Sequence, residues 1–160
     1  MSEVAPTTFT LLRLYFPRID GSFIKLPSTN SYNQTLRVAV SLYDDHHLII
    51  LLGIQLISDE KDKNDKPSAA LIVECAAEIE LNKDLGQVNS LDDIPLAANM
   101  LAMLFPFLRE KVNYFFSNNH VQLLLNPINT LQLTKEMKPG NGLEIFDVRD
   151  KKIETKTTTV

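Results

Sequence analysis

The stretch that decides the fold is Leu101-Ala-Met-Leu-Phe-Pro-Phe-Leu-Arg-Glu-Lys-Val-Asn-Tyr-Phe-Phe116. Around it, apolar residues recur every three or four positions, which is the spacing of a helix with one buried stripe. The stripe consists of Leu96, Ala97, Met100, Leu101, Leu104, Leu108, Val112 and Phe115 or Phe116. Pro106 lacks a backbone N–H and clashes with the carbonyl four residues earlier, so the helix should break, kink or restart near Phe105. Apolar residues off the stripe, such as Phe107 and Tyr114, predict a second partner surface.

Four β-strands are predicted before the helix, at residues 9–16, 36–43, 48–57 and 69–81. The second strand alternates, with Leu36, Val38 and Val40 on one side, which is typical of a half-buried antiparallel strand. Pro17 should end the pairing of the first strand. Because consecutive strands joined by turns pair as hairpins, we predict an antiparallel meander of four strands.

The remaining elements complete an α+β prediction. The long helix should begin near Ser90, with Asp92 or Asp93 as its cap, and a short second helix should occupy 129–137 before Pro139. The predicted fold is thus a four-stranded antiparallel sheet with a long kinked helix and a short second helix packed on one face. We expect a flexible N-terminus at 1–8, a single domain at 9–138, and a C-terminal tail at 139–160 that is at least partly disordered.

Composition narrows the class of function. The 160 residues suit one domain, and 44% hydrophobic with 22% charged residues is ordinary for a globular protein. A net charge of −4 gives no electrostatic reason to expect nucleic-acid binding. The single cysteine, Cys75, fits a reducing compartment, and neither a signal peptide nor a bilayer-spanning segment is recognisable. We therefore expect a cytoplasmic protein that is not inserted in a membrane.

Three groups of residues are of types that bind metals or act in catalysis, but each group more often has a purely structural role. The turn 44–47, Asp-Asp-His-His, has metal-ligand types but no second cluster to complete a site. Cys75 lies in a strand, where a cysteine is usually a small buried hydrophobic residue. Glu74, Glu78 and Glu80 share one side of a strand, which usually marks an exposed or docking face. We therefore expect no catalytic residues, no metal and no cofactor, and thus not an enzyme.

Several segments, taken in order, are similar to the SecB-like family of bacterial export chaperones. The strongest is 104–112, Leu-Phe-Pro-Phe-Leu-Arg-Glu-Lys-Val, which resembles the family's LFPYARE-type segment. Downstream, 123–129 resembles the LNLxPVNF-type segment; upstream, Phe9 with Arg13-Leu14-Tyr15 resembles the FxxxRIY start of the first strand. Residues 71–75 stand where the family has a strand reading roughly FLCEV. The resemblance covers residues 9 to about 130.

The resemblance implies an ATP-independent holdase that binds unfolded polypeptides in a hydrophobic surface groove, without catalysis. It also implies a homo-oligomer, a dimer or a dimer of dimers, in which long helices and first strands meet. The candidate groove residues are Tyr32, Leu36, Val38, Val40, Leu131 and Leu133. The candidate interface or core residues of the helix are Phe105, Pro106, Phe107, Arg109, Glu110 and Phe115. For the strand residues, burial in the core is the ordinary alternative.

The acidic sheet face by which the family docks the SecA motor matches only in part. Glu74 matches one acidic position, whereas Ile24 stands where a second acidic residue would be. The resemblance therefore supports a SecB-like chaperone better than export through SecA. The alternative is a dedicated interaction protein, an adaptor or antitoxin-associated partner that holds one specific client. The shortened second helix and the lack of tryptophan favour this narrower client range.

Overall fold

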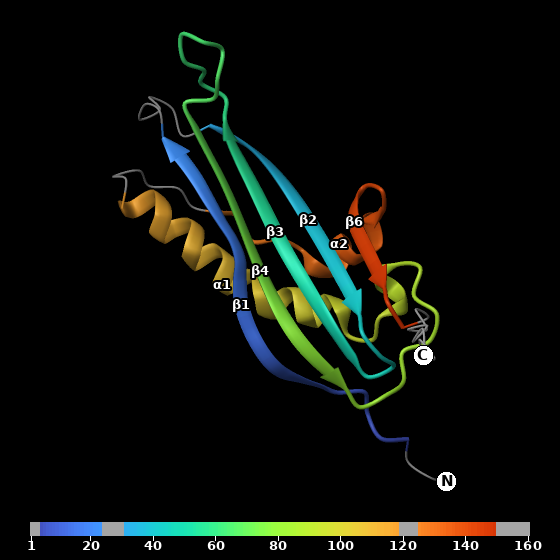
Figure 1. The fold of residues 1–160 in the computed structure, drawn as a ribbon. Helices are drawn as coiled ribbons and strands as arrows, with labels where there is room; N and C mark the ends of the chain where they lie inside the picture. The colour runs from blue at the N-terminus through green and yellow to red at the C-terminus, as the bar shows by residue number, and fades with distance from the viewer. Residues whose placement is uncertain (1–3, 24–30, 119–124, 150–160) are drawn as a thin grey trace, which may run out of the picture.

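The structure, a computed structural model, describes residues 4–23, 31–118 and 125–149. These residues form one curved sheet with helices on one face (Figure 1). The elements in chain order are β1 (Phe9–Phe23), β2 (Tyr32–Leu42), β3 (His47–Ser58), β4 (Ala69–Leu81), the 3₁₀ turn η1 (Leu91–Asp93), α1 (Ala97–Asn118), α2 (Thr130–Glu136), β5 (Lys138–Pro139) and β6 (Gly142–Asp147).

The sheet has six strands in the order β1-β4-β3-β2-β6-β5. The pairs β1–β4, β4–β3 and β3–β2 are antiparallel, whereas β6 runs parallel to β2 and β5 parallel to β6. The α+β class is confirmed, but the prediction of a four-stranded antiparallel meander is wrong. β2, β3 and β4 follow one another along the sheet as predicted. β1, however, lies beside β4 at the edge of the sheet and not beside β2.

Strand β1 continues past Pro17, where the sequence predicted an end. Its register against β4 shifts between Leu11 and Arg13 and again between Tyr15 and Arg18, which leaves Pro17 outside the ladder. A proline in such a bulge needs no ladder hydrogen bond, so pairing resumes beyond it. Near the end of the strand Gly21 lies under the ring of Phe115, which a Cβ at this position would strike.

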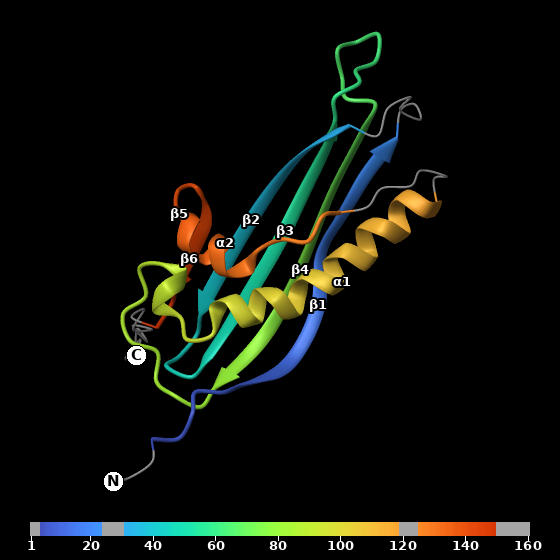
Figure 2. The same ribbon diagram turned by 180° about the vertical axis from the view of Figure 1, so that it is seen from behind.

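The hydrophobic core lies between the sheet and α1, which covers β3 and β4 (Figure 2). Alternate residues of β2, β3 and β4 point into it, and these side chains have almost no exposed surface. The predicted helical stripe faces them: Met100, Leu101, Leu104, Leu108 and Val112 are each 0% exposed. At its end Phe116 is buried and Phe115 is half-buried, which resolves the choice that the sequence left open.

Pro106 lies inside α1, which runs from Ala97 to Asn118 without interruption. The expected break or restart near Phe105 is therefore not observed. Pro106 is on the exposed side of the helix, whereas Leu104 and Leu108 on either side of it are buried. Water can satisfy the backbone carbonyl that the proline leaves free, and the buried stripe holds both halves of the helix against the sheet.

A separate turn precedes α1. Asp93 accepts hydrogen bonds from the backbone N–H groups of Asn89 at 2.8 Å and Ser90 at 3.1 Å, which closes the turn η1. These bonds, the one from Asn89 first, lower the pKa of Asp93. Leu96 then takes a left-handed backbone conformation with φ of 60°. The helix consequently begins at Ala97, later than the sequence predicted, because Leu96 cannot continue a right-handed helix.

The described chain after α1 forms a short helix and two short strands. The predicted second helix is confirmed as α2, with the side chain of Asn129 accepting from the backbone N–H of Gln132 at 3.0 Å. The chain then turns at Gly140 and Gly142, both with positive φ, and β6 pairs with β2. The sheet therefore includes 142–147, which the sequence analysis assigned to the tail; residues 150–160 lie outside the described residues.

Candidate functional site

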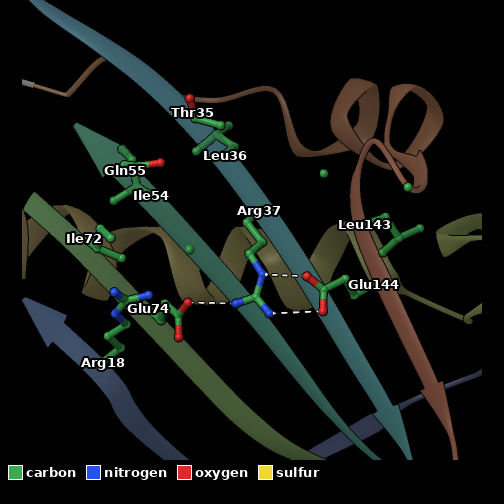
Figure 3. Close-up of a pocket in the computed structure, with 13 residues that line it drawn as sticks. Arg18, Thr35, Leu36, Arg37, Ile54, Gln55, Ile72, Glu74, Leu143 and Glu144 are labelled. Carbon is green, nitrogen blue, oxygen red and sulfur yellow. Dashed lines mark hydrogen bonds and ion pairs between the residues drawn. The ribbon is translucent and has the colours of Figure 1, made fainter. Parts of the chain in front are cut away.

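A row of charged side chains crosses the sheet face opposite α1 (Figure 3). Arg37 of β2 donates from Nη1 to Glu74 Oε1 of β4 at 2.7 Å, and from Nε to Glu144 Oε1 of β6 at 3.2 Å. The side chain of Glu74 is 12% exposed, that of Arg37 40% and that of Glu144 50%. Arg37 therefore ties the added strand β6 to the middle of the sheet, and its tighter partner is the more buried one.

Gly53 of β3 allows Arg37 to reach across its neighbour. Gly53 is the register partner of both Arg37 and Glu74, so it lies directly under their ion pair. A Cβ on Gly53 would lie 3.3 Å from Cγ of Glu74 and 3.7 Å from Cβ of Arg37. A larger side chain here would occupy the path of the guanidinium group and separate the two charges.

The ion pairs lie in an open cavity of about 490 Å³ on this face. Arg18 also lines it, but its guanidinium is 3.6 Å from the carboxylate of Asp20 on its own strand. Each arginine in the cavity thus has an acidic partner, and the two arginines face three carboxylates, those of Asp20, Glu74 and Glu144. The other lining residues include Thr35, Gln55, Ile72, Gly140, Gly142 and Leu143. The arrangement offers hydrogen-bonding groups at a strand edge and contains no nucleophile with an adjacent base.

A second ionic cluster fastens the end of β6. The guanidinium of Arg149, whose side chain is 14% exposed, contacts Asp147 at 2.7 Å and Asp45 at 3.2 Å. It also donates to the backbone carbonyls of Leu85 at 3.2 Å and Gly86 at 3.0 Å. The hydrogen bonds from Arg149 lower the pKa of Asp147. This cluster, the Arg149 clasp, joins the chain after β6 to the β2–β3 turn and to the loop that follows β4.

Large apolar side chains remain exposed on the outer side of α1. Phe107 is 43% and Tyr114 66% exposed, and with Phe16 of β1 they line a shallow cavity of about 330 Å³. Lys111 lies in the same cavity, with its Nζ 5.0 Å from the centre of the Phe16 ring. An aromatic surface of this kind at the junction of a helix and an edge strand is typical of a protein–protein contact.

The six predicted interface or core residues of α1 divide between these two roles. Phe105 is buried, and Phe115 is half-buried with its ring stacked on Phe23 at 5.3 Å between centroids. Pro106, Phe107 and Glu110 are exposed, and Arg109 is partly exposed. The first two belong to the core of this chain, whereas the other four face outward.

The predicted groove residues differ widely in exposure. Val38 and Val40 are each 0% exposed within the hydrophobic core, and a side chain without exposed surface cannot touch a client in this conformation. Tyr32 is half-buried against the ring of Phe116 at 5.2 Å. Leu131 is 59% exposed. Leu36 and Leu133 are partly buried against the core. The role of these four in client binding stays a prediction.

The other residues singled out in the sequence have ordinary surroundings. Asp44 accepts from the backbone N–H groups of His46 and His47, so the turn 44–47 is a hydrogen-bonded, exposed turn. The described residues contain no group of three or more side chains placed to hold a metal ion. Cys75 is buried, and desolvation raises the pKa of its thiol to about 11. A thiol with that pKa is a poor nucleophile near neutral pH.

The row of glutamates on β4 is matched by basic groups. Glu74 is bound by Arg37, Glu78 lies 3.8 Å from Arg13, and Glu80 lies 3.8 Å from His47. Glu74, the residue at the acidic position by which the family docks SecA, is thus shielded and paired. Glu78 and Glu80 are more exposed than Glu74, and the role of Glu74 in docking SecA stays a prediction.

Sequence reasoning missed Arg37, Glu144 and Arg149. Apart from Asp147, which binds Arg149 from two residues away, their partners lie 37 or more residues away in sequence. Two signals pointed toward them. Gly53 interrupts an otherwise apolar strand, which often marks the close approach of another group. Leu143-Glu144-Ile145-Phe146 after two glycines has the alternation of a short strand.

Comparison with known proteins places the fold among SecB-like chaperones. The sequence matches no protein-family model and no curated protein. A solved structure with the same fold is the SecB-like chaperone Rv1957 of Mycobacterium tuberculosis, in complex with a ChAD peptide from the HigA1 antitoxin Rv1956. The two chains are 15% identical and superpose with a TM-score of 0.58 over 75% of this chain and 90% of the other. The fold is therefore SecB-like. Among the described helices, none has the length and apolar character needed to cross a bilayer.

Proposed function

We propose that this protein is an ATP-independent chaperone that holds non-native polypeptide segments on its surface. The observation that carries the proposal is a SecB-like fold that leaves large apolar side chains exposed on its helical side, among them Leu131 and Phe107. Exposed apolar surface is unfavourable in water unless it is covered by a partner or a client. Contacts of this kind tolerate many sequences, which suits clients that share only their non-native state. The proposed activity needs no catalytic residue and no cofactor.

We further propose that the chain works as a homo-oligomer, a dimer or a dimer of dimers. The surface formed by Phe16, Phe107 and Tyr114 is the proposed contact between copies, because it joins the long helix to the edge strand β1. A cytoplasmic location is part of the same proposal. Docking to SecA is not, because Glu74 is enclosed under Arg37.

A second candidate is a dedicated partner that holds one specific client. The M. tuberculosis SecB-like chaperone bound to a peptide from an antitoxin favours this candidate. The short helix α2 also favours a dedicated partner, because it offers less apolar surface than a long helix would. A general chaperone should protect unrelated proteins, whereas a dedicated partner should protect one.

The two candidates are separated by aggregation measurements without ATP. Two unrelated proteins are unfolded in denaturant and diluted with and without this protein, and light scattering is followed. Suppression of both at a near-stoichiometric ratio is the expected result for a general holdase. Suppression of neither, by protein that circular dichroism shows to be folded, would contradict the general holdase. It would leave the dedicated partner, to be sought by pull-down from the native cell.

A further inference from the structure

We infer that the outer edge of β2 is a docking line for an extended client segment, and that β6 is a built-in strand which such a segment replaces. This inference rests on the proposed function and names the surface and the kind of segment that it binds. The inference is based on the way in which β6 is attached to the sheet. β6 pairs along the outer edge of β2, and a client segment could make most of the same contacts.

The first observation is that β6 occupies only part of the edge. It pairs with β2 from Val38 to Leu42. In the described part of the chain, the first half of β2, from Tyr32 to Arg37, pairs with β3 and with no strand on its other side. Unpaired backbone N–H and C=O groups at such an edge accept an additional extended strand. The open half continues directly into the half that β6 covers.

The second observation is the pattern of β6 itself. Leu143 is 1% exposed and, like Ile145, packs into the core beside β2. Glu144 between them points to the other face and binds Arg37. An extended segment with two aliphatic residues around one acidic residue would therefore satisfy the same pockets and the same arginine. The structure thus gives the chemistry of the occupant: apolar, acidic, apolar.

The third observation is that ionic groups hold β6 at Glu144 and at the end of the strand. Arg37 binds Glu144, whose side chain is 50% exposed, and the Arg149 clasp fastens the strand's exit. Contacts that include such exposed carboxylates are weakened by salt and by water. The strand nevertheless competes from within its own chain, at an effective concentration in the millimolar range. A client must therefore be long enough to use the open half of the edge, or the clasp must be loosened.

The Arg149 clasp supplies the control variant, because it lies beyond the docking line. Arg149→Ala should release the end of β6 and leave Arg37 and the apolar contacts of the docking line unchanged. We expect this variant to bind a client segment about tenfold more tightly, a factor that corresponds to about 1.4 kcal/mol. Arg37→Met should instead abolish the preference for an acidic residue.

A reversible lock tests the inference in the full-length chain. Ser41 and Phe146 are register partners on β2 and β6. Neighbouring strands are about 4.8 Å apart, within the range of Cα separations that a disulfide spans. The variant Ser41→Cys/Phe146→Cys therefore closes β6 onto β2 when oxidised and opens it when reduced. The native Cys75 is buried and does not compete.

The probe is a fluorescein-labelled peptide with the sequence of residues 141–148, and its binding is followed by fluorescence anisotropy. A matched peptide carries Glu144→Lys. We expect weak binding to the wild-type chain, tighter binding to Arg149→Ala, none to the oxidised lock, and recovery on reduction. The Glu144→Lys peptide places a positive charge beside Arg37 and should bind about tenfold more weakly to the wild-type chain and to Arg149→Ala.

Equal binding to the oxidised and reduced lock would overturn the inference, and so would the absence of binding to every form. Dimers that form only when β6 is released would show that β6 exchanges between copies, which would also overturn the assignment of a client. Binding of a permanently unfolded protein is measured on the same samples. If the oxidised lock still binds the unfolded protein, the proposed function is supported and the docking line is refuted. If the wild-type chain binds no unfolded protein, the proposed function itself is refuted.

Discussion

For the ion pairs of Arg37, we predict that the burial of each acidic partner decides the coupling free energy. Arg37 has two acidic partners, and the side chain of Glu74 is 12% exposed whereas that of Glu144 is 50% exposed. A charged hydrogen bond that is largely shielded from water contributes more than an exposed one. We therefore expect a coupling free energy of about 1.5 kcal/mol for Arg37 with Glu74, and of about 0.5 kcal/mol or less for Arg37 with Glu144.

The couplings are measured by double-mutant cycles. Arg37→Met keeps the aliphatic part of the side chain, and Glu74→Gln and Glu144→Gln keep the shape of each carboxylate. The free energy of unfolding is obtained from urea titrations at pH 7 and constant protein concentration, because assembly would make stability depend on concentration. The Arg13–Glu78 pair on the same face, at 3.8 Å and 62% and 36% exposed, is the control and should give a coupling near zero.

Two outcomes of the double-mutant cycles would refute this reasoning. A coupling with Glu144 as large as that with Glu74 would mean that burial does not set the strength of these pairs. A coupling with Glu74 as small as that of the control pair would mean that Arg37 does not cross β3 in solution. Gly53→Val provides an independent check, since it should reduce the Arg37–Glu74 coupling by blocking the path of the guanidinium.

Three further predictions concern the core and its titrating groups. Phe116→Ala should lower the free energy of unfolding by about 3–5 kcal/mol in urea titrations, because Phe116 is 1% exposed; the 53% exposed Tyr43→Ala should change it by less than about 0.5 kcal/mol. The folded-state pKa of Asp93 lies below its ordinary 3.8, so its stabilising contribution is present above that pH and is lost as pH falls through the folded value. Urea titrations from about pH 5 to about pH 2 should show this loss, and Asp93→Asn should reduce the slope. Cys75, with a pKa of about 11, should react with a thiol reagent at pH 8 only at the rate of unfolding; fast labelling of folded protein would contradict its burial.

The elements with strong periodicity could be predicted from the sequence. The buried stripe of α1 and the alternation of β2 depend on local patterns, and both are confirmed. Strand β4 has the predicted bounds, Ala69–Leu81, because a long apolar run between two polar loops leaves little freedom in its ends. The short helix α2 was also visible, since Pro139 limits its length.

The arrangement of the strands could not be predicted in the same way. Placing β1 beside β4 depends on long-range pairing, and the hairpin rule applies only where strands are joined by short turns. Strand β6 is six residues long, and its stability depends on β2, Arg37 and the Arg149 clasp. A local pattern of that length does not distinguish a strand from an ordered tail.

The candidate site was the least predictable part. Arg37, Glu74 and Glu144 lie on three strands, and they meet only because the register places Gly53 beneath them. Val38 and Val40 show the opposite case: their alternation predicted one buried face correctly, but periodicity alone could not say whether a helix or a client covers that face. The structure shows both side chains enclosed in the core.

The central claim, that this protein binds non-native polypeptide without a nucleotide, is tested most directly by sedimentation velocity. The protein is mixed with a permanently unfolded, fluorescently labelled polypeptide in the absence of ATP, and the labelled species is followed. The account predicts that the label sediments with an oligomer of this chain at near-stoichiometric ratio. A folded monomer that leaves the labelled polypeptide free at micromolar concentration would contradict both the proposed activity and the proposed assembly.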